Sequence, residues 1–146
     1  MMNRTFLFFT LAIATTLVPL RGATTDGEVD ARKAALELAG AFSNDGFKMR
    51  DGHWTGPLKR GEQALVAVNL YAGNQYWFSV AADGGPKNFT VRLYDEAGQP
   101  LTTENYEDEA TAAAGFAPNI SGQYFVRIGP VEGDAAGTFC LVYSYR

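Results

Sequence analysis

The stretch Phe89–Leu101, FTVRLYDEAGQPL, decides the fold because it joins a strand pattern to a turn pattern. Its first half alternates apolar and polar side chains and puts Phe89, Val91 and Leu93 on one face. This period of two residues is typical of a half-buried β-strand. Its second half, DEAGQP, consists of residues that favour turns. The stretch therefore predicts a strand that enters a hairpin turn.

The same alternation recurs along the chain, with glycine-rich and polar turns between the runs. The clearest further runs are LVAVNL at 65–70, GNQYWFSVAAD at 73–83, GQYFVRIG at 122–129 and GTFCLVYSY at 137–145. Weaker strands are predicted near 53–58, 100–104 and 111–117. A spacing of roughly 8 to 12 residues between short strands favours an antiparallel arrangement. We predict an all-β fold, an antiparallel β-sandwich or jelly roll of about eight strands.

The segment before the first strand has a helical pattern instead. Ala31, Ala35, Leu38 and Phe42 recur at helical spacing and form one apolar stripe. Asp26 is placed to cap the start of the helix, and the SNDG sequence follows its end. We expect one short N-terminal helix that packs on the sandwich, within a helical segment at 23–45 and a sandwich domain at 46–146.

The first 22 residues have the pattern of a signal peptide. Arg4 precedes an apolar run from Phe6 to Leu20, which is short for a membrane span of about 20 residues. We predict export to the periplasm or the extracellular space, with no membrane span after processing. The alternative is an N-terminal anchor that stays uncleaved.

Charge and cysteine content narrow the range of partners. The formal net charge is −4, and loss of Arg4 and Arg21 with the leader makes it more negative. An acidic domain has no electrostatic preference for nucleic acid, so we expect none as a partner. Cys140 is the one cysteine, which excludes a disulfide within the chain. Its apolar run, TFCLVYSY, indicates a buried and unreactive thiol.

Several ordered motifs carry a family resemblance. They are G-x-L-x-x-G-E, L-x-A-G-x-x-Y-x-F, L-Y-D-x-x-G and P-x-x-S-G-x-Y-x-V-R, which follow one another between about Gly56 and Ile128. In this order they resemble the bacterial pre-peptidase C-terminal domain, a jelly-roll-like β-sandwich module of secreted proteins. The resemblance implies a bacterial, non-catalytic accessory domain. In this sequence the module follows only a helical segment, so we do not carry over the role of a domain appended to an enzyme.

Residues for catalysis are sparse. His53 is the one histidine, and no serine lies in a G-x-S-x-G motif. Ser43, Ser79, Ser121 and Ser144 are the serines that follow the leader. We therefore expect a protein that is not an enzyme, and a small secreted hydrolase built around His53 is the minor alternative.

Two acidic clusters raise the question of calcium. They contain Asp95 with Glu96, and Asp108 with Glu109. Calcium takes six to eight oxygen ligands, but the spacing here matches no calcium-loop motif, and Asp95 also suits a turn. We expect no cofactor, with calcium bound by these four carboxylates as the alternative.

Outward aromatic residues suggest a binding surface. Trp77, Tyr94 and Phe125 have the outward parity of their strands, and Arg92 and Arg127 lie beside them in sequence. Exposed together, they would stack on sugar rings; alternatively, the helix near Leu38 and Phe42 covers them.

These observations lead to three functional hypotheses. The first is a non-catalytic exported domain that binds another secreted protein or cell-envelope material. The second is a carbohydrate-binding module that takes up a polysaccharide on its outward aromatic face, and the third is the hydrolase. The sequence does not determine the oligomeric state.

Overall fold

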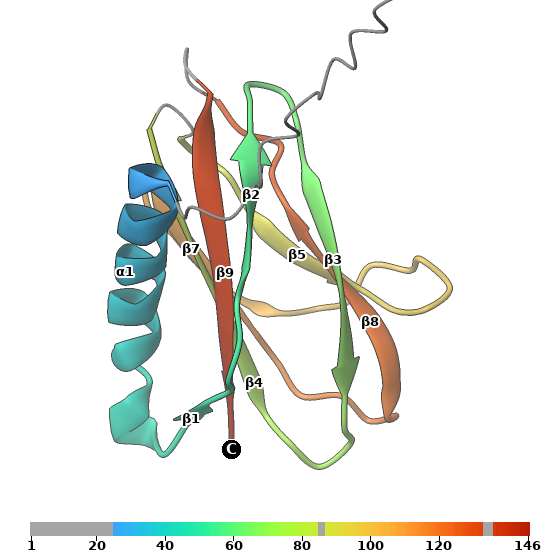
Figure 1. Cartoon of the computed structure of the whole chain (residues 1–146). Coiled ribbons are helices and arrows are strands. Elements are labelled where there is room, and N and C mark those ends of the chain that lie inside the picture. The colour runs from blue at the N-terminus through green and yellow to red at the C-terminus, as the bar shows by residue number, and fades with distance from the viewer. Residues whose placement is uncertain (1–24, 85–86, 133–135) are drawn as a thin grey trace, which may run out of the picture.

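The computed structural model describes residues 25–84, 87–132 and 136–146 (Figure 1). The described residues form two antiparallel sheets with nine strands and one N-terminal helix, which confirms the predicted β-sandwich. The predicted signal peptide at 1–22 lies outside the described residues.

The larger sheet has six strands in the order β1-β9-β4-β7-β6, and β2 also pairs with β9. Its strands are β1 (Lys48–Met49), β2 (Trp54–Leu58), β4 (Tyr76–Asp83), β6 (Glu104–Glu107), β7 (Thr111–Phe116) and β9 (Gly137–Tyr145). The smaller sheet has the order β3-β8-β5. Its strands are β3 (Ala64–Leu70), β5 (Val91–Tyr94) and β8 (Gly122–Ile128).

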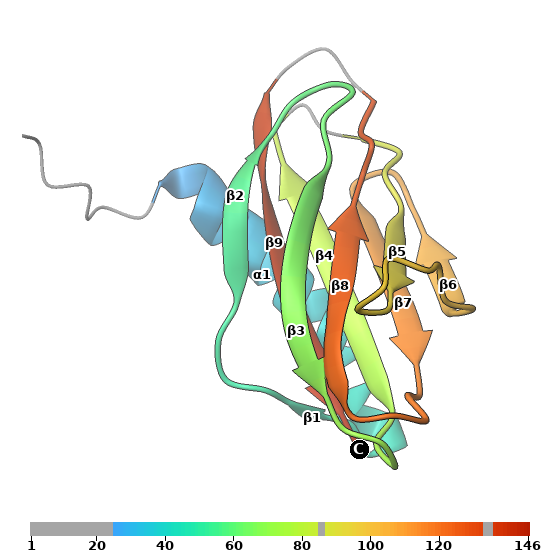
Figure 2. The same cartoon turned by 90° about the vertical axis from the view of Figure 1, so that its right-hand side faces the viewer.

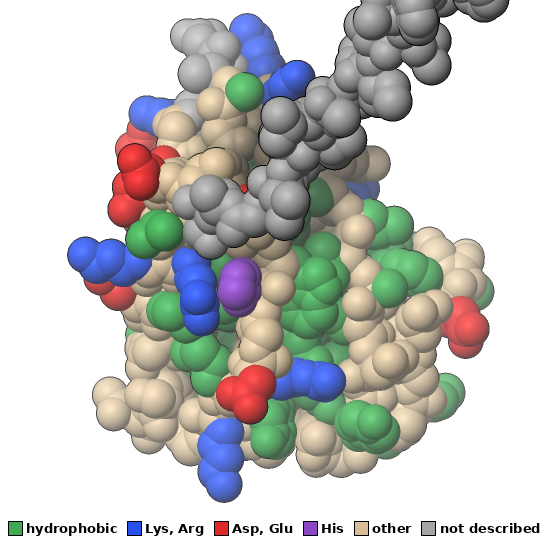
Figure 3. Space-filling model, in the orientation of Figure 1, with side chains coloured by type: hydrophobic (Ala, Val, Ile, Leu, Met, Phe, Trp, Pro, Cys, Tyr) green, Lys and Arg blue, Asp and Glu red, His purple; other side chains and the backbone are tan. Residues whose placement is uncertain are grey.

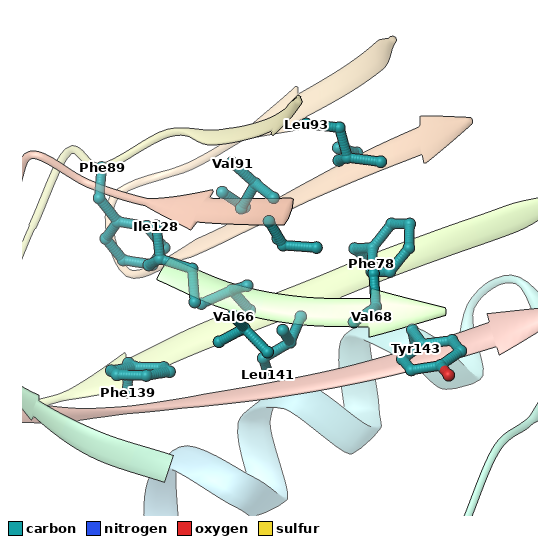
Figure 4. Packing of buried hydrophobic residues seen from close by; sticks show 14 of the residues in the cluster. Val66, Val68, Phe78, Phe89, Val91, Leu93, Ile128, Phe139, Leu141 and Tyr143 are labelled. Carbon is teal, nitrogen blue, oxygen red and sulfur yellow. The ribbon is translucent and has the colours of Figure 1, made fainter. Parts of the chain in front are cut away.

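The core lies between the two sheets and is filled by every second side chain of the strands. Figure 4 shows these side chains pointing toward one another from both sheets, among them Val68 and Phe78. Two inward tyrosines form hydrogen bonds through their hydroxyls at the rim of the core. The Tyr76 hydroxyl accepts from the Tyr71 backbone N–H at 2.9 Å, and the Tyr124 hydroxyl donates to the Ile120 carbonyl at 2.5 Å. The core thus follows the predicted alternation.

The helix α1 (Asp26–Gly40) lies on the outer face of the larger sheet, as predicted (Figure 1). Its cap is Thr25 rather than Asp26, because Thr25 and Glu28 form a reciprocal capping box. Its buried stripe is Ala31, Ala35 and Ala39, so the prediction of Leu38 was wrong by one position. Small side chains let the helix approach the sheet closely, where it packs on Ala81, Cys140 and Val142.

The predicted turn after β5 is confirmed. The Gln99 backbone N–H donates to Asp95 Oδ1 at 2.8 Å, the Gly98 N–H donates to the Asp95 carbonyl at 3.0 Å, and Gly98 has φ +79°. A left-handed backbone at this position favours glycine. The stretch that opened the sequence analysis is therefore a strand followed by an Asp-stabilised turn.

The hairpin predicted at this turn forms only next to the turn itself. The Leu101 N–H donates to the Leu93 carbonyl at 2.9 Å, and a single bridge joins Tyr94 to Pro100. The chain then crosses to the other sheet, where β6 pairs with β7. All four residues of β6 are exposed, and a short polar strand suits an edge rather than a half-buried hairpin.

Candidate functional site: the outer face of the smaller sheet

The two sheets present different outer faces to their surroundings. The helix α1 covers β4 and β9 of the larger sheet, whereas no described element lies over β3, β8 and β5 (Figure 2). We call the outward side of these three strands the bare face. It is the candidate binding surface of the molecule.

Strand register places the outward side chains of the bare face in two rows. One row contains Ala67, Phe125 and Tyr94, because Phe125 stands opposite both of the others. The second row contains Leu65, Arg127 and Arg92, with Arg127 in the middle. Four of the five predicted ligand-binding residues are thus neighbours here: Tyr94, Phe125, Arg92 and Arg127.

The two arginines give the bare face a positive charge beside its aromatic rings. The Arg127 guanidinium lies 5.2 Å from the centre of the Tyr94 ring, a cation–π arrangement. Its Nε is buried and has no hydrogen-bond partner among the described residues. Arg92 Nη1 lies 3.0 Å from Glu107 Oε1, which balances the charge of one of two adjacent cations. A ligand can therefore contact Arg127 only through its terminal Nη groups, because the Nε is closed off from solvent.

The connection from β5 to β6 stands out from the side of the bare face (Figures 1 and 2). It begins with the turn that Asp95 stabilises directly after Tyr94. The molecule therefore has an open sheet face bordered by a projecting loop.

The structure places the fifth predicted residue, Trp77, on the other sheet. A Cβ built on Gly115 would lie 2.9–3.0 Å from three atoms of its six-membered ring, so the ring covers this glycine. Phe42 stacks on the ring at 4.4 Å between centroids and 7° between planes. Trp77 thus lies between Gly115 and Phe42, as the alternative of burial by the helical segment predicts. It belongs to the attachment of that segment and not to a platform with Tyr94 and Phe125.

The four predicted metal ligands do not form one cluster. Asp95 and Glu96 follow β5, whereas Glu109 contacts Lys87 before the start of the same strand. Asp108 Oδ1 accepts from the Glu109 backbone N–H at 2.7 Å, and Glu109 forms an ion pair with Lys87 at 2.5 Å. This hydrogen-bonded pair raises the pKa of Lys87. Within the described parts of the chain, no three His, Cys, Asp or Glu side chains are placed to hold a metal ion.

The residues considered for catalysis lie apart from one another. His53 is exposed in a groove of about 620 Å³ between α1 and β2, together with Arg32 and Thr55. Ser79 and Ser144 are buried on the larger sheet, and their hydroxyls have no hydrogen-bond partner among the described residues. Burial raises the pKa of Cys140 to about 11, which keeps this thiol protonated and unreactive.

No protein-family model matches this chain, and no curated protein matches its sequence. The resemblance to pre-peptidase C-terminal domains therefore stays a prediction. No helix among the described residues is long and apolar enough to cross a membrane.

The sequence analysis missed two residues of the bare face, Leu65 and Ala67. Leu65 is 62% exposed and lies beside the aromatic row of the bare face. The alternation of LVAVNL could have identified them, because residues 65 and 67 occupy the outward positions of this strand. The alternation predicts that these two side chains point outward, but it does not predict which strand lies next to them.

Proposed function

We propose that this chain is a non-catalytic exported binding domain and that the bare face is its binding surface. The observation that carries the proposal is the contrast between a helix-covered sheet and a sheet whose half-buried outward aromatic and arginine side chains lie under no described helix. Apolar side chains that lie together on the surface of a soluble protein often mark the place where a partner binds. The ligand we propose is another secreted protein or cell-envelope material.

A carbohydrate is the second candidate, and the row of Tyr94 and Phe125 favours it. Neighbouring rings on a flat sheet offer a stacking surface for successive sugar rings, and the guanidinium of Arg127 offers hydrogen-bond donors next to them. Trp77 is no part of this site. Calcium has no role in the proposed function.

The test is a binding assay with insoluble envelope polysaccharides and a glycan array. We expect the double variant Tyr94→Ala, Phe125→Ala to lose retention while it stays folded. The matched control is Tyr106→Ala, because Tyr106 is 43% exposed but lies on β6 of the other sheet. Equal retention of the double variant and the wild type would show that the bare face is not the binding surface.

A further inference from the structure

A small pocket at one end of the sandwich lies away from the bare face. Its volume is about 270 Å³, below the range of roughly 300–1,000 Å³ typical of drug-sized ligands. It is lined by Arg50, Tyr71, Asn74, Tyr76, Tyr143 and Tyr145. The lining therefore contains one cation and four phenol rings but no carboxylate.

Strand pairing fixes the walls of this pocket. Tyr76 of β4 stands opposite Tyr145 of β9. Tyr143 lies two residues before Tyr145 on β9 and therefore points to the same side of the sheet. The Tyr76 and Tyr143 rings meet edge to face at 6.1 Å, and Trp54 stacks on Tyr143 at 5.7 Å. Because three of the four lining rings, Tyr76, Tyr143 and Tyr145, belong to paired strands, the pocket is preorganised.

The pocket lies toward the side where the two sheets part. Apolar side chains gather in the opening between β2 and β3 (Figure 3). Tyr143 lies at one end of the core cluster, and its hydroxyl points away from the other labelled side chains (Figure 4). A small molecule can therefore reach this end of the core from solvent.

Hydrogen-bond donors outnumber acceptors in the pocket. The Tyr76 hydroxyl accepts from the Tyr71 backbone N–H at 2.9 Å and from Asn74 Nδ2 at 3.1 Å. Its own proton has no acceptor among the described residues. The Tyr143 hydroxyl also keeps its proton at neutral pH, because the ordinary pKa of a tyrosine is about 10 and burial raises the pKa of Tyr143 further.

Arg50 supplies the positive charge. Its backbone N–H donates to the Tyr143 carbonyl at 3.0 Å, and its guanidinium lies 5.4 Å from the centre of the Tyr143 ring. It has no carboxylate partner among the described residues. A guanidinium held over a ring presents its remaining N–H groups as a fork, which matches the two oxygens of a carboxylate.

We propose that this pocket binds a small carboxylate attached to a single ring. The carboxylate pairs with Arg50 and accepts from the phenol hydroxyls, while the ring packs against the exposed rings of Tyr71 and Tyr145. A ligand of this kind supplies the negative charge and the acceptors that the lining lacks, and one ring fits the volume. The inference does not depend on the proposed function, because the two sites share no residue.

The test is an NMR titration of the isotope-labelled protein with glucuronate, benzoate and glucose. We expect at least one of the two carboxylates to shift the signals of residues 71–76 and 143–145 at millimolar concentration, and glucose to leave them unchanged. Comparison of glucuronate with benzoate shows whether the natural ring is a sugar or an aromatic one. Either result supports the proposal.

Variants separate this pocket from the rest of the surface. We expect Arg50→Gln to weaken carboxylate binding by about tenfold or more, since a hydrogen-bonded charge is lost. Lys48→Gln is the matched control, because it removes an exposed charge two residues earlier. Arg92→Gln tests the bare face and should also leave carboxylate binding unchanged.

A folding defect in Arg50→Gln does not decide the matter, so a second variant is needed. Tyr71 is 58% exposed, and Tyr71→Ala should fold normally and weaken binding several-fold. The proposal is overturned if neither carboxylate binds, if glucose binds equally well, or if a folded Tyr71→Ala protein binds like the wild type. Failure of the bare-face variants in the polysaccharide assay leaves this result intact.

Discussion

The two outer faces of the sandwich differ in the size and chemistry of their side chains. Under α1, the larger sheet presents Ser79, Ala81, Cys140 and Val142, all of them small and buried. The bare face presents Leu65, Phe125 and Tyr94 with two arginines. A helix needs small residues below it to approach a sheet, whereas large outward residues keep a helix at a distance. The size of outward side chains therefore distinguishes a covered face from an open one.

This comparison explains why Trp77 and Phe125 have different roles despite the same outward parity. The outward neighbours of Trp77 along β4 are Ser79 and Ala81, which belong to the covered face. The outward neighbours of Phe125 are Gln123 and Arg127, which belong to the open one. Both rings are half-buried, but Trp77 leads into the small side chains under the helix, whereas Phe125 lies between polar side chains on a face that no described helix covers.

The largest effect should come from removal of the Trp77 ring. Trp77→Ala leaves a cavity between Gly115 and Phe42, so we expect the free energy of unfolding to fall by about 3 kcal/mol. Phe125→Ala on the bare face should cost less than about 1 kcal/mol. Urea denaturation of both variants checks the comparison. Similar losses would mean that the two faces are equally packed.

Overpacking under the helix should have the next largest effect. Ala35 is fully buried against the larger sheet, so Ala35→Leu pushes the helix outward and should cost about 2 kcal/mol. Lys33→Leu, at an exposed position of the same helix, should stay within about 0.5 kcal/mol of the wild type. Thermal and urea unfolding measure both. A tolerated Ala35→Leu would show that the helix is only loosely attached.

Alkaline pH should weaken the covered face. The pKa of Cys140 rises from 9.0 to about 11 on burial, so above pH 9 the unfolded chain releases a proton that the folded chain retains. Stability is therefore full below pH 9 and falls toward pH 11, with a loss of about 1 kcal/mol between about pH 8 and pH 10.

Urea unfolding over this pH range measures the alkaline effect. Cys140→Ala should make the decline shallower without abolishing it, because the raised pKa of Tyr143 acts in the same direction. An identical decline in this variant would mean that the thiol is not buried by the helix.

The smallest effect should come from the ion pair beside the bare face. Arg92 and Glu107 are partly exposed, with side-chain exposures of 36% and 44%. Glu107→Gln should therefore change the free energy of unfolding by less than about 0.5 kcal/mol, and by still less in high salt. A larger, salt-insensitive loss would show that this pair holds the two sheets together.

Much of the fold was predictable because strand alternation and turn chemistry are local. The inward positions of Phe89, Val91 and Leu93 and the turn at Asp95 follow from their own stretch. The crossing of residues 102–107 to the other sheet was not predictable in this way, since a strand here has turns on both sides and the local pattern does not choose between β5 before it and β7 after it. The pocket around Arg50 was missed because its lining comes from three segments that lie far apart in the sequence.

By itself, the sequence determined which side chains point inward, where the turns fall and that a helix precedes the strands. The backbone of an extended strand sends successive side chains to opposite faces whatever its partner is. Only the tertiary structure decided which strands share a sheet, and hence that Tyr94 meets Phe125 while Trp77 meets Phe42. Pairing depends on contacts between distant segments, and no local pattern records those contacts.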